Sequence, residues 1–555
     1  MEEFKKLLSS SGFSGDIDDS NEILDLYSHD ASMFEIKPKL VISPKSASDV
    51  EKAVKLVAEN KKTMPELSLT ARSAGTDMSG AAINDSIIVD FKKYFTEIHW
   101  IKKRSSRLQP GVMFKDFDEQ AKREMNVLMP TYPASRDLAT VGGMVNNNSG
   151  GEKSIEFGKA EDFVNELEFV FADGVKRIVK PLKKPELVRK MAQQDFEGKV
   201  YREIFELIEK NYDLIKSAKP NVSKDSTGYH LWNVWDRETG IFDLNQIIVG
   251  AQGTLGFVTD IEFRMTEARS DEGLLVIFVK DIENLGDLIK DVVAAKPSRF
   301  ESFDDNTMWL SIKFMPAFLK LLGLRKFIKL VFSLIPEVLL LFKGIPSLIL
   351  MVSIKGNSPE ETEANVHKLR LKLEENKKKY HISGFEEYSS NAKGEKFWIM
   401  RRYSFQILRS KVKDKHTAPF IDDFIVNPEH LPEFLPKIRK IIKKYKLFAT
   451  IAGHMGDGNF HIIPLMDLED KLDRAKILPA MKEVNELVLS YGGSLSGEHN
   501  DGLIRGPWLE KMYGKKMVKL FRDAKDIFDP EGIFNPRKKA NADWDYSFSH
   551  IRKKF

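Results

Sequence analysis

Short apolar runs separated by polar and glycine-rich turns dominate the first half of the chain. Runs of this length are typical of buried strands. Examples are residues 86–90, 167–171 and 246–249. Amphipathic stretches lie between them, and one begins after Ser46, where nearby carboxylates predict the first turn of a helix. Strands that alternate with helices predict an α+β fold for residues 35–268, after a short helical lead-in at residues 1–34.

The second half of the chain predicts a separate α+β domain over residues 269–520. Apolar runs with the length of buried strands alternate there with long amphipathic stretches. The strands are predicted at residues 273–279 and 348–352, and the helices at 360–379, 432–444 and 472–491. A closing segment, residues 521–555, follows. Beyond Arg537 it is basic and polar, so we expect that tail to fray.

Residues 314–347 form an insert in the second domain that is rich in leucine, isoleucine and phenylalanine. The cations that interrupt it are Lys320, Arg325, Lys326, Lys329 and Lys343. No uncharged run approaches the ~18–20 residues of a membrane-spanning helix, so we reject a transmembrane segment. Two interpretations remain: helices that pack on the protein's own surface, or a helix pair that lies on a membrane surface.

Composition narrows the possible functions. A chain of 555 residues is too long for one hydrophobic core, so two or three domains are expected. The net charge of +4 is small for this length and, without a basic run alternating with aromatics, gives no indication of nucleic-acid binding. The absence of cysteine excludes disulfides, iron–sulfur ligation, a thiol nucleophile and a cysteinyl flavin link. Since the N-terminus has no apolar signal region, we expect a cytoplasmic protein.

The stretch from Gly453 to His461 carries the sharpest chemical signal. Asp457 and Gly458 predict a two-residue hairpin turn, which would place His454 directly opposite His461. Residues paired in this way have Cβ atoms roughly 4.5–5.5 Å apart, a spacing that suits one divalent metal ion. Glu498 downstream offers a third ligand. The alternative is a pair of ordinary histidines beside a turn.

Three glycine-rich loops precede that hairpin, at residues 69–80, 133–151 and 249–260. Glycine, serine and asparagine allow the backbone to approach a planar or phosphorylated ligand closely. None of the loops has the spacing of a nucleotide triphosphatase loop or of a Rossmann dinucleotide site. Three such loops in one α+β domain predict a large, buried ligand that is held at several points.

The order of these blocks resembles the FAD-linked oxidases of the vanillyl-alcohol-oxidase/p-cresol-methylhydroxylase (PCMH) superfamily, and in particular the D-2-hydroxyacid dehydrogenases for D-lactate, glycolate and D-2-hydroxyglutarate. The resemblance covers roughly residues 35–540. It implies a PCMH-type, two-subdomain FAD-binding domain over residues 35–268, followed by a C-terminal α+β cap domain of the FAD-linked oxidase type.

The resemblance also implies which residues hold FAD. The first loop would bind the pyrophosphate, the second would line the isoalloxazine and the ribityl chain, and the third would complete the pocket. The implied residues are Arg72, Ser73, Ala74, Gly75, Thr76, Asp77, Ser79, Gly80, Pro133, Ala134, Ser135, Thr140, Gly142, Gly143, Asn146, Asn147, Gly150, Gln252, Gly253, Thr254, Gly256, Val258 and Asn535. His99 and His230 lie outside the three loops, so the FAD is predicted to be non-covalent.

In metal-dependent relatives, the residues that match His454, His461 and Glu498 bind Zn²⁺ or a similar ion. The resemblance assigns the role of general base to His499, and the binding of a substrate carboxylate to Arg401. These roles suit the oxidation of a 2-hydroxyacid: a metal on the hydroxyl oxygen lowers its pKa, and an imidazole that titrates near neutrality takes the proton. Hydride would pass from C2 to flavin N5.

Departures from the family pattern concern the substrate. Hydroxyglutarate-type relatives carry a lysine and a polar residue where this chain has Ile421 and Ile463, which favours a D-lactate-like acid. Lys415 or His416 could replace the missing lysine. Asn500 stands where many relatives have glycine, and asparagine tolerates the left-handed backbone that such a turn needs.

Other functions stay open at this point. An enzyme similar to alkylglycerone-phosphate synthase would use FAD without net redox change. A zinc hydrolase would use the two histidines and Glu498 and leave the glycine loops structural. A non-catalytic membrane-surface adaptor would depend on residues 314–347 alone. For the dehydrogenase, we expect a quinone or an electron-transfer flavoprotein as acceptor, with possible peripheral contact on the inner face of a membrane.

Overall fold

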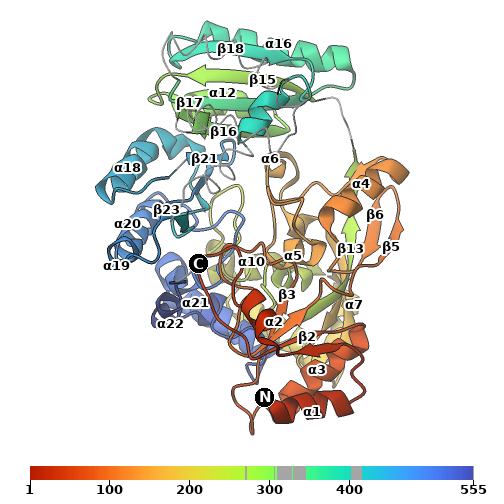
Figure 1. Ribbon diagram of the computed structural model, residues 1–555. Helices are drawn as coiled ribbons and strands as arrows, with labels where there is room; N and C mark the ends of the chain where they lie inside the picture. The colour runs from red at the N-terminus through yellow and green to blue at the C-terminus, as the bar shows by residue number, and fades with distance from the viewer. Residues whose placement is uncertain are drawn as a thin grey trace.

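The computed structural model describes residues 1–268, 272–305, 307–308, 328, 346–401, 415–449 and 451–553. Figure 1 shows a large lower part built from the first half of the chain and a smaller sheet above it, with blue C-terminal elements along one side. The predicted α+β class is confirmed, because helices cover mainly antiparallel sheets in both parts.

A four-stranded sheet holds the first glycine-rich loop. Its strands are, in spatial order, β1 (Asp16–Asp18), β2 (Leu40–Ser43), β4 (Ile87–Asp90) and β3 (Leu69–Arg72). The last three are parallel. Helix α3 (Ala47–Asn60) covers this sheet and begins where predicted, because the Ser46 side chain accepts a hydrogen bond from the Asp49 amide.

A five-stranded antiparallel sheet lies in the same half of the chain. Its strands are, in order, β5 (Ile98–Ile101), β6 (Ser105–Leu108), β13 (Phe257–Arg264), β8 (Val164–Val170) and β9 (Lys176–Val179). The predicted strand at residues 246–249 is wrong: this run forms a short helix, α11 (Asn245–Ile248). A buried apolar run of four residues fits a helix as well as a strand, and the Asp243 side chain, which accepts from the Asn245 amide, starts the helix.

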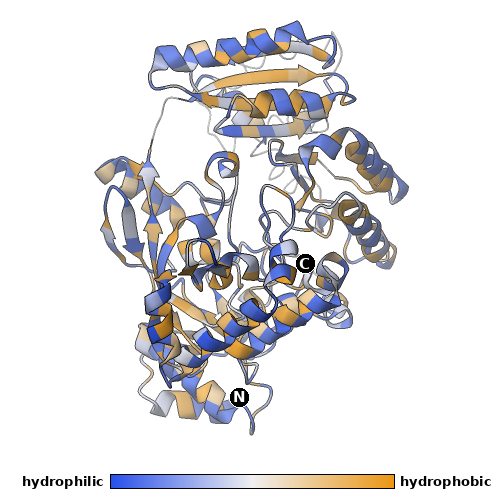
Figure 2. Cartoon of the chain, turned by 180° about the vertical axis from the view of Figure 1, so that it is seen from behind, coloured by the Kyte–Doolittle hydropathy of each residue, from blue (hydrophilic) through white to orange (hydrophobic). Residues whose placement is uncertain are grey.

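The cap domain is a seven-stranded antiparallel sheet with helices on its outer side. Its strand order is β18 (Ile382–Tyr388), β15 (Glu272–Val279), β17 (Leu348–Lys355), β16 (Arg299–Asp304), β21 (Ile451–His454), β22 (Asn459–Ile462) and β20 (Phe424–Ile425). The central strands are buried on both faces, and Figure 2 shows them largely in the hydrophobic colour. The main helices are α12 (Leu285–Val293), α16 (Pro359–Glu375), α18 (Leu431–Lys444) and α20 (Ile477–Ser490).

The C-terminal tail does not fray as predicted. After α21 (Leu509–Phe528) the chain runs beside β3, where Phe534 forms a parallel bridge with Leu69. Lys539 is fully buried, and its Nζ donates to Asn500 (2.6 Å) and Asp501 (2.9 Å). The basic composition of the tail predicted lysines exposed to solvent. In the structure, Lys539 instead binds buried acceptors.

The hydrophobic insert predicted at residues 314–347 lies outside the described residues, apart from residues 328, 346 and 347. Among the helices of the described residues, none has both the length and the apolar content needed to cross a membrane.

Candidate functional site

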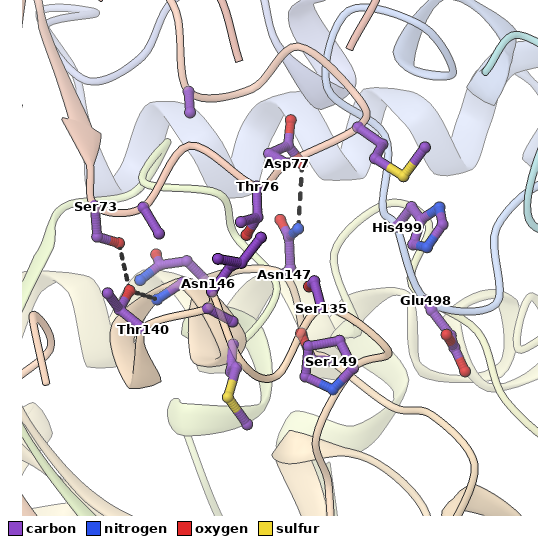
Figure 3. Close-up of a pocket in the computed structure, with 18 of the residues that line it drawn as sticks. Ser73, Thr76, Asp77, Ser135, Thr140, Asn146, Asn147, Ser149, Glu498 and His499 are labelled. Carbon is purple, nitrogen blue, oxygen red and sulfur yellow. Dashed lines mark hydrogen bonds between the residues drawn. The ribbon is translucent and has the colours of Figure 1, made fainter. Parts of the chain in front are cut away.

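A cavity of about 710 Å³ lies between the FAD-binding half and the cap. Its walls come from the three glycine-rich loops and, at the cap, from Thr307, Arg401, Ala452, His454, His461, Ile463, Glu498 and His499. Figure 3 shows Ser73 and Thr140 on one side of this space and Glu498 and His499 on the other. Both groups of residues that the sequence singles out therefore line one cavity.

Hydrogen bonds between side chains tie the three loops to one another. Thr140 Oγ1 donates to Ser73 Oγ at 2.7 Å, which joins the first loop to the second. The Asn147 amide donates to Asp77 at 3.1 Å and accepts from the Gln252 amide at 3.1 Å, so one side chain connects all three loops. Two of these bonds are drawn in Figure 3. Side-chain bonds thus link the three loops into one frame.

Asp77 shapes the first loop from within. Its carboxylate accepts from the backbone amides of Ser79 (3.0 Å) and Ala81 (2.8 Å), which curls the chain back on itself. Gly75 has a φ of +67°, and a Cβ there would lie 2.6 Å from the Arg72 guanidinium, so this position requires glycine.

Eighteen of the implied FAD residues line the cavity, from Arg72 to Val258. Five others lie behind the wall: Ser79, Gly80, Thr254, Gly256 and Asn535. For these five, direct contact with FAD is corrected to support of the wall. Thr254, for example, bonds to the Tyr229 hydroxyl (2.6 Å), and a Cβ on Gly256 would meet Phe169 at 2.4 Å.

Asn535 illustrates this support. Its amide donates to the carbonyls of Ala81 (2.9 Å) and Gln252 (2.8 Å), and its oxygen accepts from Thr70 (2.9 Å). The C-terminal segment therefore returns to the site, as predicted, but it locks the first and third loops from behind rather than touching the cavity.

The hairpin has a different register from the predicted one. His454 pairs with Asn459, and His461 pairs with Ala452, because the turn contains four residues rather than two. A shift of two positions keeps side-chain parity, so both imidazoles still lie on one face of the sheet. Their ring centroids are 5.3 Å apart. The predicted proximity is therefore confirmed, although its geometric reason is wrong.

A carboxylate holds the Nδ1 atom of each imidazole at the site. Glu301 lies directly opposite His454 in the neighbouring strand and bonds to its Nδ1 at 2.6 Å. Asp422 bonds to Nδ1 of His461 (3.2 Å) and to Nδ1 of His499 (2.6 Å). Such pairs fix the orientation of an imidazole and leave Nε2 for a metal or a substrate.

The Nε2 atoms of His454 and His461 both face the Glu498 carboxylate. His454 Nε2 lies 3.1 Å from one carboxylate oxygen and His461 Nε2 lies 3.8 Å from the other. The Lys224 ammonium, itself buried, donates to Glu498 and lies 3.5 Å from Asp457. Burial alone would raise the pKa of Glu498, but the cations around it hold that pKa well below its usual range.

Two histidines of the site, His454 and His499, have raised pKa values. Burial lowers the pKa of His499, yet Asp422 and Asp423 outweigh it and raise that pKa to about 9. Glu301 and Glu498 do the same for His454, whose pKa is also about 9. In this arrangement of side chains, the pKa of His499 therefore lies above the neutral range expected from the sequence.

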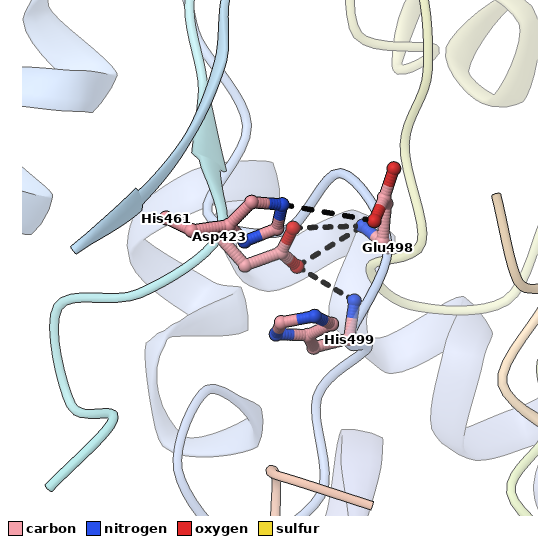
Figure 4. Close-up of side chains that lie close together, drawn as sticks. All are labelled: Asp423, His461, Glu498 and His499. Carbon is pink, nitrogen blue, oxygen red and sulfur yellow. Dashed lines mark hydrogen bonds and ion pairs between the residues drawn. The ribbon is translucent and has the colours of Figure 1, made fainter. Parts of the chain in front are cut away.

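Asp423 braces the loop that carries Glu498 and His499. Its carboxylate accepts from the backbone amides of Glu498 (3.0 Å) and His499 (2.6 Å) and from the Ser496 hydroxyl (2.5 Å). Figure 4 shows the bonds from the Glu498 and His499 amides, with His461 beside them. Ligand atoms of Asp423, His461, Glu498 and His499 lie within 4.8 Å of one another. Because the oxygens of Asp423 are already occupied, the set of His454, His461 and Glu498 suits a cation better.

Arg401 lines the cavity, but its guanidinium pairs with Glu301. Its Nε is buried and has no hydrogen-bond acceptor among the described residues. Of the substrate-related positions, Ile463 lines the cavity, whereas Ile421 belongs to the cap core and Lys415 and His416 lie outside the cavity wall.

Sequence reasoning assigned no role to Glu301, Lys224, Asp422 or Asp423. Glu301 had a detectable signal, since it is a carboxylate between Phe300 and Phe303 in an apolar strand. Lys224 had none, because its partner is 274 residues away. His99 and His230 pair with carboxylates, and neither lines the cavity.

Asn500 connects this cluster to the FAD loops. It has the predicted left-handed backbone, with a φ of +69°. Its amide donates to the carbonyls of Gly250 (2.9 Å) and Asn147 (3.3 Å). The residue that departs from the family pattern therefore adds bonds between the two ends of the cavity.

Comparison with known families matches both halves of the chain. Residues 38–178 match the family described as FAD binding domain, and residues 269–539 match FAD linked oxidases, C-terminal domain. The D-2-hydroxyglutarate dehydrogenase of Pseudomonas putida is 28% identical over 542 residues, which are 97% of this chain and 51% of that protein. The chain thus spans about half the length of that relative.

Other relatives match over their full length. The D-lactate dehydrogenase of Anaerostipes hadrus is 23% identical, with 97% of this chain and 96% of that protein covered. Among solved structures, an alkyldihydroxyacetonephosphate synthase has a TM-score of 0.66 at 15% identity, covering 97% of this chain and 86% of its own. p-Cresol methylhydroxylase has a TM-score of 0.65 at 14% identity, covering 98% and 97%. At such identities the structures show a shared fold alone.

Proposed function

The chain is a member of the FAD linked oxidases, in which an FAD-binding domain precedes their C-terminal domain, and from that premise we propose that it oxidises a D-2-hydroxyacid to the 2-oxoacid. Relatives named as dehydrogenases of D-2-hydroxyglutarate and D-lactate support this class of substrate. One observation carries the proposal: the His454, His461, Glu498 and His499 cluster closes the same cavity that the three glycine-rich loops line.

The cavity fits a large, elongated cofactor. Its volume lies within the range of about 300–1,000 Å³ that is usual for ligand pockets. Gly75, Gly142, Gly143, Gly150 and Gly253 form much of its wall, together with small hydroxyl and amide side chains. When bound there, FAD supplies the acceptor for the hydride of the substrate's C2. We propose that the protein binds FAD non-covalently, since neither His99 nor His230 lines the cavity.

A divalent cation, such as Zn²⁺, fits His454, His461 and Glu498. The two imidazoles present Nε2 to Glu498, and Glu301 and Asp422 fix their other nitrogens, which is the usual environment of a histidine ligand. A cation at this point would polarise the hydroxyl oxygen of the substrate. Lys224 would then hold Glu498 from behind.

His499 is the proposed proton acceptor. Its Nδ1 is bonded to Asp422, so Nε2 is the nitrogen that remains for the substrate hydroxyl. To accept a proton it must first be neutral. A divalent cation bound to the neighbouring Glu498 would lower the pKa of His499 from its value of about 9 toward neutrality.

Arg401 is proposed to bind the C1 carboxylate. It is the only arginine or lysine that lines the cap side of the cavity among the described residues, and its buried Nε has a free N–H there. Ile463 and Ala452 add uncharged surface beside it, which supports a small, D-lactate-like side chain on the substrate.

Anaerobic titration of the purified protein tests the proposal. With FAD and Zn²⁺ present, D-lactate should bleach the flavin absorption near 450 nm, whereas L-lactate should not. Glycolate and D-2-hydroxyglutarate measure the side-chain preference. Acid precipitation should leave the flavin in the supernatant. A flavin that no 2-hydroxyacid bleaches would contradict the proposal.

The electron acceptor is proposed to be a quinone or an electron-transfer flavoprotein, because the chain has no cysteine to ligate an iron–sulfur relay. Steady-state rates with a soluble quinone and with an electron-transfer flavoprotein distinguish the two. The zinc-hydrolase hypothesis would leave the FAD-binding domain without a role. Ester hydrolysis by flavin-free protein would support that hypothesis.

A further inference from the structure

Helix α18 carries a concentrated positive charge on the outside of the cap. Residues 437–446 contain six cations and no anion: Lys437, Arg439, Lys440, Lys443, Lys444 and Lys446. All six are exposed. Since the whole chain has a net charge of only +4, the remainder of the chain is slightly negative. Residues 437–446 therefore carry a charge of +6, which exceeds the net charge of the whole chain.

The arrangement of the helix accounts for this face. Leu431, Phe434, Leu435 and Ile438 are buried against the cap, and at 3.6 residues per turn the cations fall on the opposite side. In Figure 1, α18 lies at the edge of the molecule beside α20. The cationic side therefore faces solvent.

Packing of the fold does not explain most of these charges. Lys444 pairs with Glu483, and Lys437 donates to the Tyr491 hydroxyl at 2.6 Å. Arg439, Lys440 and Lys443, with Lys446 beyond them, form no ion pair among the described residues. Like charges three and four positions apart on a helix repel one another. Only cations in the last turn gain from the helix dipole.

Two features favour a lipid surface over an acidic protein. Five of the six cations are lysines, whose flexible point charges suit mobile phosphate groups, whereas fixed carboxylates of a protein are better met by the planar fork of arginine. Apolar and aromatic groups also lie at the cationic end of the helix: Phe448 is 45% exposed, and Ile441, Ile442 and Tyr445 are half-buried. Basic residues beside partly exposed aromatic ones are typical of helices that lie in a membrane interface.

We propose that the cationic face of α18, together with Phe448, docks the protein on an anionic lipid surface. This proposal does not depend on the oxidation chemistry or on residues 314–347. A surface of this kind would bring the cap against a membrane without a spanning segment.

Vesicle sedimentation tests the proposal. The probes are phosphatidylcholine vesicles and vesicles that contain 30% phosphatidylserine, at 50 and at 300 mM salt. We expect binding to the anionic vesicles alone, weakened at high salt. Replacement of Arg439, Lys440, Lys443 and Lys446 by glutamine should lower the partition coefficient roughly 100-fold or more, because each cation near an anionic surface strengthens binding about fivefold. Phe448→Ser should lower it less and leave the salt dependence unchanged.

A matched control keeps the change in net charge the same. Lys103, Lys180, Lys184 and Lys219 are exposed lysines of the FAD-binding half without ion pairs among the described residues, and their replacement by glutamine should leave binding unchanged. Circular dichroism and thermal unfolding check that both variants fold. Equal loss in both variants, or no binding of the wild type to anionic vesicles, would overturn the proposal. Capture on poly-glutamate beads without vesicle binding would overturn it in favour of an acidic protein partner.

Discussion

The two ends of the cavity are built in opposite ways. At the FAD-binding end, hydroxyl and amide side chains such as Thr140, Asn147 and Gln252 tie the loops together. At the cap end, buried charges predominate, and Glu498 lies against Lys224 and His454. A neutral hydrogen bond contributes only about 0.5–1.5 kcal/mol, so the first end depends on many weak bonds. The cap end depends on a few strong interactions between buried charges.

This difference predicts different responses to substitution. Loss of one neutral bond leaves the other bonds of the frame in place. Loss of one charge at the cap end leaves its partner buried without compensation, which typically costs about 3–5 kcal/mol. The buried cations and anions there alternate closely, from Arg401 through Glu301 and His454 to Glu498. The energetic effects of substitutions at the two ends should therefore differ clearly in size.

The largest effect is expected for Asp422→Asn. The carboxylate orients both His461 and His499, and an amide would offer a donor to at least one Nδ1–H. The rate constant for flavin reduction under nitrogen should fall roughly 100-fold, in the upper range for outer partners of histidine ligands. Asp523→Asn, a half-buried change on α21 outside the cavity wall, should have no effect. A rate within threefold of the wild type would show that the charge at residue 422 does not position the imidazoles.

A large loss of stability is expected for Asp423→Asn. The residue has a φ of +68°, which asparagine also tolerates, so the substitution tests the charge and the acceptor atoms rather than the backbone. An amide group facing the Glu498 and His499 amides and the Ser496 hydroxyl would lower the free energy of unfolding by about 3 kcal/mol. Urea denaturation of the metal-free protein measures it. A loss below about 1 kcal/mol would contradict the brace assigned to Asp423.

A smaller effect is expected for Asn147→Ala at the other end. Its side chain joins the three loops through one bond to the Asp77 carboxylate and one neutral bond from Gln252. FAD should therefore bind about tenfold more weakly, by about 1.4 kcal/mol. Quenching of flavin fluorescence on titration measures the dissociation constant. Asn21→Ala, an exposed change in α2 (Asn21–Leu26), is the control. A loss of affinity beyond 100-fold would mean that the frame is as sensitive as the charged end.

How much of this contrast the sequence could predict differs between the two ends. Glycine and asparagine patterns in consecutive loops indicated the FAD-binding end, because backbone requirements are local. They could not separate cavity wall from support: Asn535 and Thr254 carry the same residue types as the wall but lie behind it. At the cap end, parity along two strands was enough to bring His454 and His461 together, even with the wrong register.

The charged partners at the cap end were not predictable in the same way. Glu301 meets His454 only because β16 and β21 pair, and Lys224 reaches Glu498 across 274 residues of sequence. The pKa of His499 follows from Asp422 and Asp423, whose role the sequence left open. Electrostatic properties of a buried site depend on long-range contacts, whereas loop geometry depends on neighbours in sequence.

The last effect depends on pH and concerns how far the charged region extends behind Glu498. His230 is buried between Glu161 (2.6 Å) and Asp225 (3.3 Å), and Asp225 accepts from Thr227 and Ser494 beside the Glu498 loop. Burial lowers the pKa of His230, but the two carboxylates outweigh it and raise that pKa to about 9. Because the folded-state pKa exceeds the unfolded value of about 6.5, the stabilisation is complete below pH 6.5 and is lost as pH rises through 9.

His230→Gln should therefore destabilise the protein by about 3 kcal/mol at pH 6, since one pKa unit corresponds to about 1.4 kcal/mol, and by progressively less toward pH 9.5. Urea denaturation of wild type and variant at pH 6, 7.5 and 9.5 measures the difference in unfolding free energy. His367→Gln, on the exposed side of α16, should show a smaller and flatter difference, because its partner Glu387 lies in solvent. A His230 difference that stays constant with pH would mean that neutral hydrogen bonds, as in the FAD loops, and not charge, hold this region together.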